Sequence, residues 1–373
     1  MAISSIPATP LRLGKRLLSS QLVETIIAPN GVDRYVELLD PLWSVRDVRA
    51  SIVAVDRQTP RSATLTLRLN DNWPGFEAGQ HVGLTVEIDG VLTTRFYSPA
   101  SSAARQGDTI ELTVTAHPGG RVSEHLFANA RPGTVVGISP PEGEFVLPAK
   151  RPGNLLLISG GSGITPVMSM LRTLCEEGHE GAVTFVHYAR GPEDAIYEAD
   201  LEALAARHPN VKIVHAYTRA AAPKGSLKGR ITKAQLKRIC PDYANAQTYV
   251  CGPNALIAAA ERIWESEGII DLLHSESFVL PEPAVVAEDA TGQINFIKSG
   301  IAVDNDGTPL LAQAEAAGLT PRCGCRMGIC HTCIAHIDEG AVRDVRTGEV
   351  RTVNDEFVQI CVNAPVGDVE IEL

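Results

Sequence analysis

Hydrophobic and polar residues follow three different patterns along this chain of 373 residues. Within residues 48–138, short runs rich in β-branched and apolar side chains are separated by Gly, Pro, Asn and Asp. These runs occupy residues 50–55, 63–69, 82–88, 110–115 and 134–138. Short runs punctuated by turn-forming residues are typical of a small antiparallel β-barrel. The pattern therefore predicts a barrel domain over residues 46–150.

From Asn154 onward the apolar runs become continuous. Residues 155–158 form one such run, which leads through a pair of glycines into a helical pattern from Pro166 to Glu177. The apolar runs 183–186 and 211–214 follow, with further helical patterns between them. Buried strands that alternate with helices indicate a parallel sheet covered on both faces. We therefore expect an α/β domain over residues 151–280.

A third pattern begins after a Pro-, Ala- and acid-rich stretch at residues 281–290, which predicts a linker. Residues 293–297 and 300–303 predict a hairpin, and residues 368–371 predict a closing strand. Thr308 and Pro309 supply an N-cap and a first-turn proline for a helix that ends near Gly318. The predicted fold is therefore multidomain, with a mixed α+β domain over residues 291–373.

The first 45 residues predict a helical extension. Leu11, Leu18, Leu22 and Ile26 recur at helical spacing, which suits packing on the barrel better than lying on a membrane surface, although the pattern leaves both open. No stretch approaches the roughly 20 apolar residues of a membrane span. The first five residues also lack the layout of a secretory signal. We expect a cytoplasmic protein.

Charge and cysteine content narrow the possible functions. A net charge of −11 argues against nucleic-acid binding, because phosphate backbones attract proteins through Lys and Arg. From residue 291 onward there are 6 Lys and Arg against 12 Asp and Glu, so the tail holds about half of the excess negative charge. In a reducing compartment, eight cysteines are expected to be metal ligands or thiols instead of disulfides.

Four cysteines have the spacing of an iron–sulfur site. Four residues separate Cys325 from Cys330, two separate Cys330 from Cys333, and twenty-seven precede Cys361. This is the spacing of a plant-type [2Fe–2S] ferredoxin. Gly324 and Gly328 suit a loop that closely approaches a cluster. The alternative is structural zinc, although zinc sites usually pair two short knuckles. Cys323 is an additional thiol to which the pattern gives no role.

Three further motifs precede the cysteines. The first is Arg95-Phe96-Tyr97-Ser98, which resembles the Arg-x-Tyr-Ser pattern of the ferredoxin–NADP reductase family. The resemblance implies that the guanidinium pairs with a pyrophosphate, the tyrosine ring stacks on a flavin and the serine hydroxyl bonds flavin N5. The second is a glycine turn before a helix, whose N-terminus can hold a phosphate. It contains Gly119, Gly120, Val122 and Ser123.

The third motif is a glycine loop after the apolar run 155–158. Its candidate nucleotide-binding residues are Gly160, Gly161, Gly163, Thr165 and Pro166, and the tripeptide Cys251-Gly252-Pro253 follows a later strand. The loop departs from the G-x-G-x-x-G fingerprint, and no acidic ribose ligand stands about 20 residues on. Thr218-Arg219, with Lys224 or Lys228 nearby, resembles the Ser-Arg pair that often binds the 2′-phosphate in ferredoxin–NADP reductases that use NADPH. The resemblance implies NADPH, while NADH stays possible.

In this order the motifs resemble the ferredoxin–NADP reductase family, in which Phe76, Gly79 and Gln80 also match a barrel element. The resemblance covers about residues 48–373 and is closest to the phthalate dioxygenase reductase type, with a C-terminal β-grasp ferredoxin. It implies that Gly120 and Ser123 hold the FAD pyrophosphate and that Cys251 lies beside the nicotinamide. Glu276 and Phe278 match a Glu-x-Phe segment that lies near the flavin in related reductases.

The resemblance implies an electron-transfer enzyme with FAD, a [2Fe–2S] cluster and NADPH, in which Ser98, Cys251 and Glu276 are the candidate catalytic residues. A flavin accepts the electron pair of a nicotinamide and releases single electrons to a cluster. The expected acceptor is an oxygenase or desaturase. The N-terminal residues resemble the reductases of membrane acyl-CoA desaturases. The alternatives are an aromatic-ring oxygenase, a deoxysugar dehydratase, or a redox-sensing or zinc-stabilised binding module.

Overall fold

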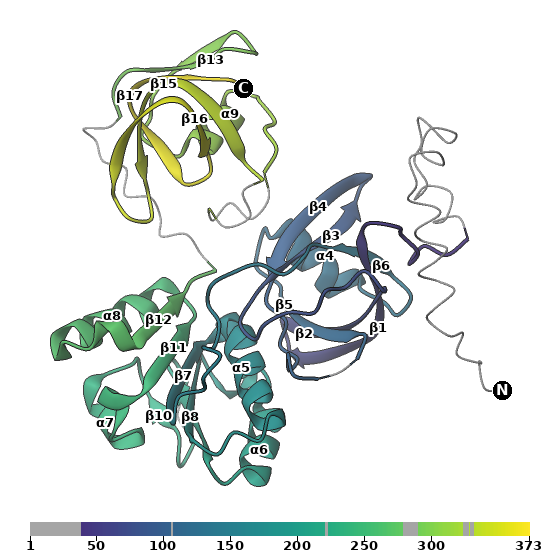
Figure 1. Cartoon of the computed structure of the whole chain (residues 1–373), viewed down its shortest axis with the longest axis vertical. Helices are drawn as coiled ribbons and strands as arrows, with labels where there is room; N and C mark the ends of the chain where they lie inside the picture. The colour runs from purple at the N-terminus through teal and green to yellow at the C-terminus, as the bar shows by residue number, and fades with distance from the viewer. Residues whose placement is uncertain (1–38, 106, 221–222, 279–289, 324–327, 329–331) are drawn as a thin grey trace. The chain divides into compact units, whose positions relative to one another are not determined.

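The computed structural model describes residues 39–105, 107–220, 223–278, 290–323, 328 and 332–373 (Figure 1). The predicted N-terminal helix around Leu11–Ile26 lies outside these residues, as do all but the last residue of the predicted linker 281–290. The chain divides into two compact units. The first comprises the residues up to Arg151 with Thr165–Glu180 and Pro192–Pro209, and the second comprises the rest.

The first unit contains a curled antiparallel sheet, as predicted. Its strands are β1 (Val48–Thr59), β2 (Ser62–Leu69), β3 (Val82–Ile88), β4 (Val91–Tyr97), β5 (Thr109–Thr115) and β6 (Val135–Ile138). Their order is β4-β3-β6-β1-β2-β5. A bridge from Pro99 to Leu112 joins the segment after β4 to β5, so that the two edges of the sheet meet. Leu65, Leu84 and Leu112 are fully buried in the resulting core.

Strand β4 was not among the predicted runs. None of its seven residues is buried, so the alternation of buried and exposed positions that marks the other strands is missing. Helix α4 (Arg121–Asn129) follows the predicted glycine turn and packs against β3, β4 and β5. Val122 and Leu126 of α4 are buried in the barrel core.

The second sheet is entirely parallel, as predicted for an α/β domain. Its strands are β7 (Asn154–Gly160), β8 (Ala182–Ala189), β9 (Val211–Tyr217), β10 (Leu227–Lys228), β11 (Gln247–Cys251) and β12 (Leu273–Glu276), in the order β10-β9-β8-β7-β11-β12. Helices α7 (Lys233–Ile239) and α8 (Asn254–Glu267) share its core through Leu236 and Trp264. Four short 3₁₀ helices, η1 (Gly161–Gly163), η2 (Pro192–Asp194), η3 (Tyr243–Asn245) and η4 (Ile270–Leu272), complete the region.

Two helices from this part of the sequence group with the barrel instead. They are α5 (Ile164–Glu176), which confirms the helical pattern from Pro166, and α6 (Glu198–Arg207). Arg172 of α5 and Tyr197, the N-cap of α6, make polar contacts with the barrel domain.

The C-terminal domain has a mixed five-stranded sheet in the order β14-β13-β17-β15-β16. The predicted hairpin is β13 (Gln293–Phe296) with β14 (Ile301–Asp304), and the predicted closing strand is the longer β17 (Asn363–Ile371), parallel to β13. The hairpin of β15 (Ile334–Asp344) and β16 (Val350–Gln359) was missed, because eight of the ten side chains of β16 are partly or fully exposed and do not alternate.

The helix of this domain, α9 (Leu310–Ala316), starts one residue later than predicted. Pro309 is its N-cap and not its first residue, and the Thr308 hydroxyl donates to Asp306 instead of capping the helix. The predicted end is correct, since the N–H of Gly318 donates to the carbonyl oxygen of Glu315. None of the helices in the described part of the chain has the length and apolar character of a membrane span.

Candidate functional site

Strand β4 presents the first predicted motif at the wall of the barrel. Arg95 and Tyr97 are two residues apart and therefore share a face of the strand, while Phe96 lies on the other face, edge-on to the ring of His81 at 5.6 Å. Tyr97 packs against the barrel core, and this burial raises the pKa of its hydroxyl, with a smaller opposing effect from Arg95. The Tyr97 hydroxyl therefore stays protonated at neutral pH.

Ser98 directly follows β4 and is 1% exposed. Among the described residues, its Oγ has no hydrogen-bond partner. Buried hydroxyl groups are nearly always hydrogen-bonded, so an orphaned one requires an explanation such as a ligand. The hydroxyl fits the predicted flavin, because a ring nitrogen at this place would complete its hydrogen bonding.

Ser98 begins a loop, residues 98–103, which we call the serine loop. On one side it pairs with β5, where the N–H of Ala100 donates to the carbonyl oxygen of Glu111 at 2.8 Å, and the N–H of Glu111 donates to Ser101 Oγ at 3.2 Å. On the other side it contacts α5 through side chains that the sequence analysis did not select. Their one sequence signal is a polar face, Ser169-Arg172-Thr173, within an apolar helix.

The glycine turn of the second motif leads into α4 as predicted. Gly120 is the N-cap, no side chain caps the first turn, and the helix is nine residues long. The Ser123 hydroxyl donates to the carbonyl oxygen of Gly120 at 3.1 Å, and Glu124 accepts from the N–H of Gly119 at 3.2 Å. The side chain of Val122 is buried, so a phosphate would meet its main-chain N–H. The positive end of α4 suits a pyrophosphate.

The third motif lies at the point in the parallel sheet where the order of the strands reverses. Strands β8, β9 and β10 lie on one side of β7, whereas β11 and β12 lie on the other. Ligands of open α/β sheets bind at the carboxyl ends of the strands at such a switch point. The predicted loop, residues 160–163, follows β7, and Cys251-Gly252-Pro253 follows β11, so both segments lie at this point. We call residues 160–163 the glycine loop.

The glycines of these two segments fit against each other. A Cβ on Gly163 would lie 2.4 Å from the carbonyl oxygen of Cys251, and one on Gly252 would lie 3.0 Å from the nitrogen of Gly160. Gly161 differs, because no atom of the described residues lies within 4 Å of an added Cβ and its φ is +54°. Packing thus requires glycine at positions 163 and 252, whereas the surface of Gly161 is open to a ligand.

The residues that follow the glycine loop start α5. Thr165 is 3% exposed, and Pro166 lies in the first turn, where a helix tolerates proline. Pro253 is the N-cap of α8. Each of these residues therefore also has a structural role at a helix start.

Cys251 and Glu276 are brought together by the sheet. They are direct partners at the carboxyl ends of β11 and β12, and Ser159 of β7 is the partner of Cys251 on its other side. Cys251 is fully buried, and burial together with the charge of Glu276 raises the pKa of its thiol well above the usual value. A neutral thiol is a poor nucleophile, so Cys251 suits a role in contact and positioning. Phe278 is half-buried two residues after Glu276.

The candidate 2′-phosphate residues lie at the carboxyl ends of β8 and β9. The N–H groups of Thr218 and Arg219 donate to the carbonyl oxygens of Ala189 and Arg190, both at 3.0 Å, which joins the two strand ends. The side chains of Arg190 and Arg219 are exposed, as is that of Lys228 on the neighbouring strand β10. This edge of the sheet is therefore basic.

Two of the four predicted cluster ligands are described. Cys333 and Cys361 are 2% and 4% exposed, while Cys325, Cys330 and Gly324 lie outside the described residues. The N–H of Gly328 donates to Cys361 Sγ at 3.3 Å, the kind of bond that a cluster sulfur ligand receives. The half-buried Cys323 packs against the core of this domain.

Gly328 is itself held firmly. Its carbonyl oxygen accepts from Arg346 Nη1 at 3.1 Å and from Gln359 Nε2 at 3.0 Å, and Asp344 pairs with Arg346 at 2.6 Å. A Cβ at Gly328 would lie 2.6 Å from Nη1 of Arg346. The described thiols and this cradle fit a [2Fe–2S] site, in which these residues would bind the iron and order the loop.

Comparison with known proteins agrees with this arrangement. Family models match in three places: an oxidoreductase FAD-binding domain at residues 51–147, an oxidoreductase NAD-binding domain at 157–262 and a 2Fe-2S iron-sulfur cluster binding domain at 295–365. An NADPH oxidoreductase of Mycobacterium tuberculosis is 38% identical over 362 residues, which cover 95% of this chain and 91% of that protein. The chain belongs to this family of FAD- and [2Fe–2S]-containing oxidoreductases.

A second relative supports the assignment, and a solved structure shares the fold. A glycine betaine monooxygenase reductase subunit of Pseudomonas aeruginosa is 30% identical over 319 residues, which cover 80% of this chain and 87% of that protein. The solved structure of phthalate dioxygenase reductase shares the fold, with a TM-score of 0.59 at 22% identity over 87% of this chain and 97% of that chain. The present chain is thus an NAD(P)H-dependent oxidoreductase with FAD and a [2Fe–2S] cluster, which confirms the predicted cofactors.

Proposed function

We propose that this oxidoreductase is the reductase component of an oxygenase system and passes single electrons from NADPH to a protein acceptor. The observation that carries the proposal is the presence of all three redox modules in one chain whose relatives include oxygenase reductase subunits. Two relatives serve demethylating or hydroxylating systems by name, a stachydrine N-demethylase reductase subunit and a reductase component of naphthalene dioxygenase and salicylate hydroxylase systems.

In this proposal, the protein binds and orients its cofactors, which supply the conversion of an electron pair into single electrons. Arg95 and the N-terminus of α4, with Gly120 and Ser123, would hold the pyrophosphate of FAD, and Tyr97 would cover the ring. The buried Ser98 hydroxyl would donate to flavin N5. Gly161 and the neutral Cys251 would hold the nicotinamide, with Glu276 at the edge of that site. Phe278 would lie at the same edge.

NADPH is the proposed donor. Arg219 and Lys228 are exposed cations at the carboxyl edge of the parallel sheet, where a 2′-phosphate would pair with them. In Arg219→Ala, we expect the ratio of kcat/KM for NADPH to that for NADH to fall about 10-fold, the cost of one charge-assisted contact of about 1.4 kcal/mol. An unchanged ratio in this variant would refute the assignment.

The electron acceptor is proposed to be a protein with a basic docking surface. The ferredoxin domain carries 12 acidic residues against 6 basic ones, and two exposed apolar side chains, Phe357 at 71% and Ile334 at 44%, lie close in sequence to Cys361 and Cys333. Attraction between opposite charges is screened by salt, so transfer to the true acceptor should slow between low and physiological ionic strength. A rate indifferent to salt would contradict this part of the proposal.

The finer identity of the acceptor is proposed from the N-terminal resemblance alone. It favours a membrane fatty-acyl desaturase or hydroxylase over an aromatic-ring oxygenase or a deoxysugar dehydratase. With such an acceptor, the reductase would lie at the membrane surface through its partner. Measuring product formation with one purified member of each class would decide between them.

The electron path can be tested without the true acceptor. We expect rapid reduction of cytochrome c by NADPH, which Cys361→Ser abolishes while direct reduction of ferricyanide by the flavin persists. Cys323→Ser is the matched control, because Cys323 lies in the same domain and is not one of the four spaced cysteines. Equal cytochrome c rates in Cys361→Ser and wild type would overturn the proposed route through the cluster.

A further inference from the structure

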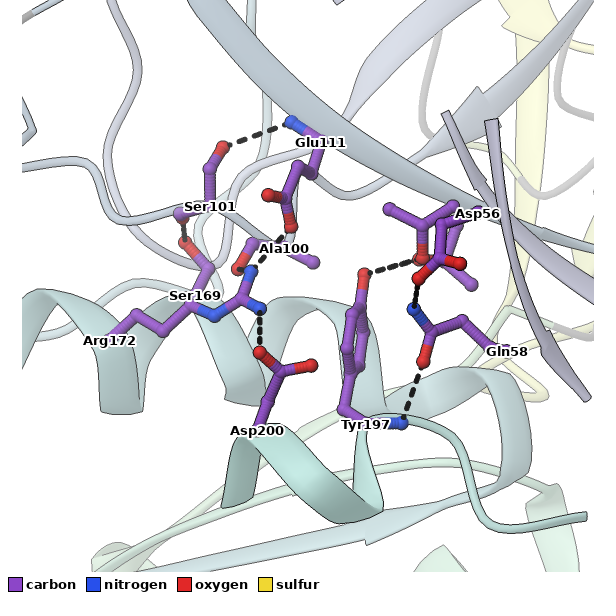
Figure 2. Close-up of polar contacts among 11 residues, drawn as sticks. Asp56, Gln58, Ala100, Ser101, Glu111, Ser169, Arg172, Tyr197 and Asp200 are labelled. Atoms are coloured by element: carbon purple, nitrogen blue, oxygen red, sulfur yellow. Dashed lines mark hydrogen bonds and ion pairs between the residues drawn. The ribbon is translucent and has the colours of Figure 1, made fainter. Parts of the chain in front are cut away.

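One face of helix α5 grips the serine loop. Three of its side chains hydrogen-bond main-chain atoms of the loop: Ser169 Oγ donates to Ser101 O at 2.7 Å, Arg172 Nη1 donates to Ala100 O at 2.9 Å, and Thr173 Oγ1 accepts from Ala103 N–H at 2.9 Å. Residues three and four apart lie on one helix face, so the three contacts form a single row. Figure 2 shows two of the three helix side chains, Ser169 beside Ser101 and Arg172 beside Ala100. The loop after Ser98 is therefore fixed to the helix at three places.

Arg172 is the centre of this row. Besides Ala100, its guanidinium pairs with Glu111 of β5 at 2.6 Å and with Asp200 of α6 at 3.4 Å, and Figure 2 shows it between the two carboxylates. Its side chain is only 17% exposed. Burial lowers the pKa of Arg172, but the charge of Glu111 leads the effects that raise it above its usual value, so the group stays cationic. One fork of donors thus joins the loop, a barrel strand and a second helix.

The far side of the guanidinium is fixed by Tyr197, whose ring lies 4.9 Å from it. The Tyr197 hydroxyl hydrogen-bonds Thr113 and Thr64 on two barrel strands. The main-chain N–H of Tyr197 donates to Gln58 Oε1 at 3.3 Å. Burial raises the pKa of Tyr197 to about 12, so the hydroxyl remains a neutral hydrogen-bonding group. Tyr197 is the N-cap of α6, which sets the position of Asp200 on the first turn of that helix.

We propose that Arg172 is a positioning residue for hydride transfer, acting through the serine loop on Ser98. This inference rests on the proposed contact between Ser98 and flavin N5. In the reaction, a hydride with its two electrons leaves C4 of NADPH and bonds to N5, so the nucleotide is oxidised and the flavin reduced. Arg172 exchanges no proton or electron. Helix α5 begins directly after the glycine loop, so the helix that continues from the nucleotide loop also holds the flavin-facing loop.

The expected effect is on rate and not on binding. Reacting atoms must approach to about 3–3.5 Å, and a misplacement of about 1 Å can cost roughly 100-fold. Loss of the Arg172 fork frees Ala100 and Glu111 but leaves the α4 N-terminus and the glycine loop intact. We therefore expect flavin reduction to slow while the affinities for FAD and NADPH change little.

The test compares Arg172→Met and Arg172→Lys with wild type, each as the full-length holoenzyme. Under single-turnover anaerobic conditions, we expect the rate of flavin reduction at saturating NADPH to fall about 10- to 100-fold in Arg172→Met and by less in Arg172→Lys, with FAD content and KM within about twofold. Hydrogen exchange supplies a readout independent of activity: in Arg172→Met, the amides of residues 98–105 should exchange faster.

The matched control is Arg151→Met. Arg151 makes an ion pair of similar type with Glu177, just past the end of the same helix, at 2.8 Å, and it also donates to the carbonyl oxygens of Leu147 and Pro148. It should leave both the flavin reduction rate and the exchange of residues 98–105 unchanged. If Arg172→Met fails to fold, the double variant Ser169→Ala with Thr173→Val keeps the ion pair, removes two loop contacts and should slow flavin reduction about 3- to 10-fold.

Two results separate this proposal from the assignment of Ser98. If Ser98→Ala slows flavin reduction whereas the Arg172 variants reduce flavin at the wild-type rate, Ser98 is at the flavin and the positioning role is wrong. If Ser98→Ala itself has no effect, the flavin contact fails, and the proposal falls with it even if hydrogen exchange shows a loosened loop. Loss of FAD from Arg172→Met with a normal rate per bound flavin would likewise overturn the positioning role.

Discussion

The glycine loop and the serine loop each follow a β-strand and each carry predicted cofactor residues, but they are held by opposite means. The glycine loop is held by the absence of side chains, since its backbone lies directly against that of Cys251 and Gly252. The serine loop is held by side chains, namely the polar row of α5 and the hydrogen bonds to β5.

This difference indicates how each loop fails. A close steric fit tolerates no added atom, because packed interiors respond to even one methyl group. A loop held by several hydrogen bonds can lose one of them and keep the others, so it shifts but stays in place. Substitutions in the glycine loop should therefore impair nucleotide binding, whereas substitutions around the serine loop should impair the rate after binding.

The largest effect is expected from Gly163→Ala. Its Cβ would lie 2.4 Å from the carbonyl oxygen of Cys251, so the glycine loop and the segment at Cys251 must separate. We expect a loss of about 3 kcal/mol of binding free energy, measured as a rise of more than 100-fold in the Kd for NADPH. Gly153→Ala is the control, because Gly153 directly precedes β7 and none of the described atoms lies within 4 Å of the added Cβ. Wild-type NADPH affinity in Gly163→Ala would show that the steric account is wrong.

The next effect tests the other loop. In Ser98→Ala, flavin reduction at saturating NADPH should slow about 100-fold, or roughly 2.7 kcal/mol, because a preorganised donor is lost. The FAD-free protein should keep its stability or gain some, since the deleted hydroxyl has no partner in the described structure. Ser102→Ala in the same loop removes only a bond from the N–H of Ala104 and should leave the rate unchanged. A change in KM without a change in rate would place Ser98 with the binding residues.

The two loops also differ in how far the sequence reveals them. The glycine loop follows a continuous apolar run, and its composition marks it locally. The grip on the serine loop depends on pairs such as Arg172 with Glu111, which are 61 residues apart and have no shared local pattern. Strand β4 was found only as a motif, because its side chains do not alternate in burial.

The C-terminal domain shows the same limit. Cysteine spacing identified the cluster, since ligand type and number are properties of the sequence. The β15–β16 hairpin escaped prediction because its outer face is exposed, and the Arg346–Asp344 pair that holds Gly328 was unforeseen. Local patterns thus predicted the buried strands and the presence of the cluster, while the supporting contacts required the folded chain.

The glycine loop also differs from the serine loop in having a buried histidine next to it, which makes stability depend on pH. Ser159, the residue before the glycine loop, hydrogen-bonds His187 Nδ1 at 2.9 Å, and His187 is fully buried. Burial, with a smaller effect of His215, lowers the pKa of His187 to about 3. The unfolded chain takes up this proton below about pH 6.5 and the folded chain does not, so stability is complete above that pH and is lost as the pH falls towards 3.

Between pH 7 and pH 5, this histidine should cost about 2 kcal/mol of unfolding free energy. His187→Asn, whose amide can still bond Ser159, should lose about 2 kcal/mol less than wild type over the same interval. Denaturant unfolding at both pH values measures the difference, which cancels the other titrating groups. Equal losses in the two proteins would mean that His187 is protonated in the folded state.

The smallest effect separates space from backbone conformation within the glycine loop. Gly161 has a φ of +54°, and in the described part of the chain no atom lies within 4 Å of an added Cβ, so Gly161→Ala meets strain but no clash. Left-handed backbone costs an L-residue about 1 kcal/mol, which predicts a rise of about fivefold in the Kd for NADPH. Gly161→Asn should recover part of this loss, because asparagine enters the left-handed region more readily than alanine. If alanine and asparagine weaken NADPH binding equally and by far more than fivefold, then the added side chain itself blocks the nucleotide. In that case Gly161, like Gly163, is required for its small size, and the open surface next to it is the nucleotide-binding surface.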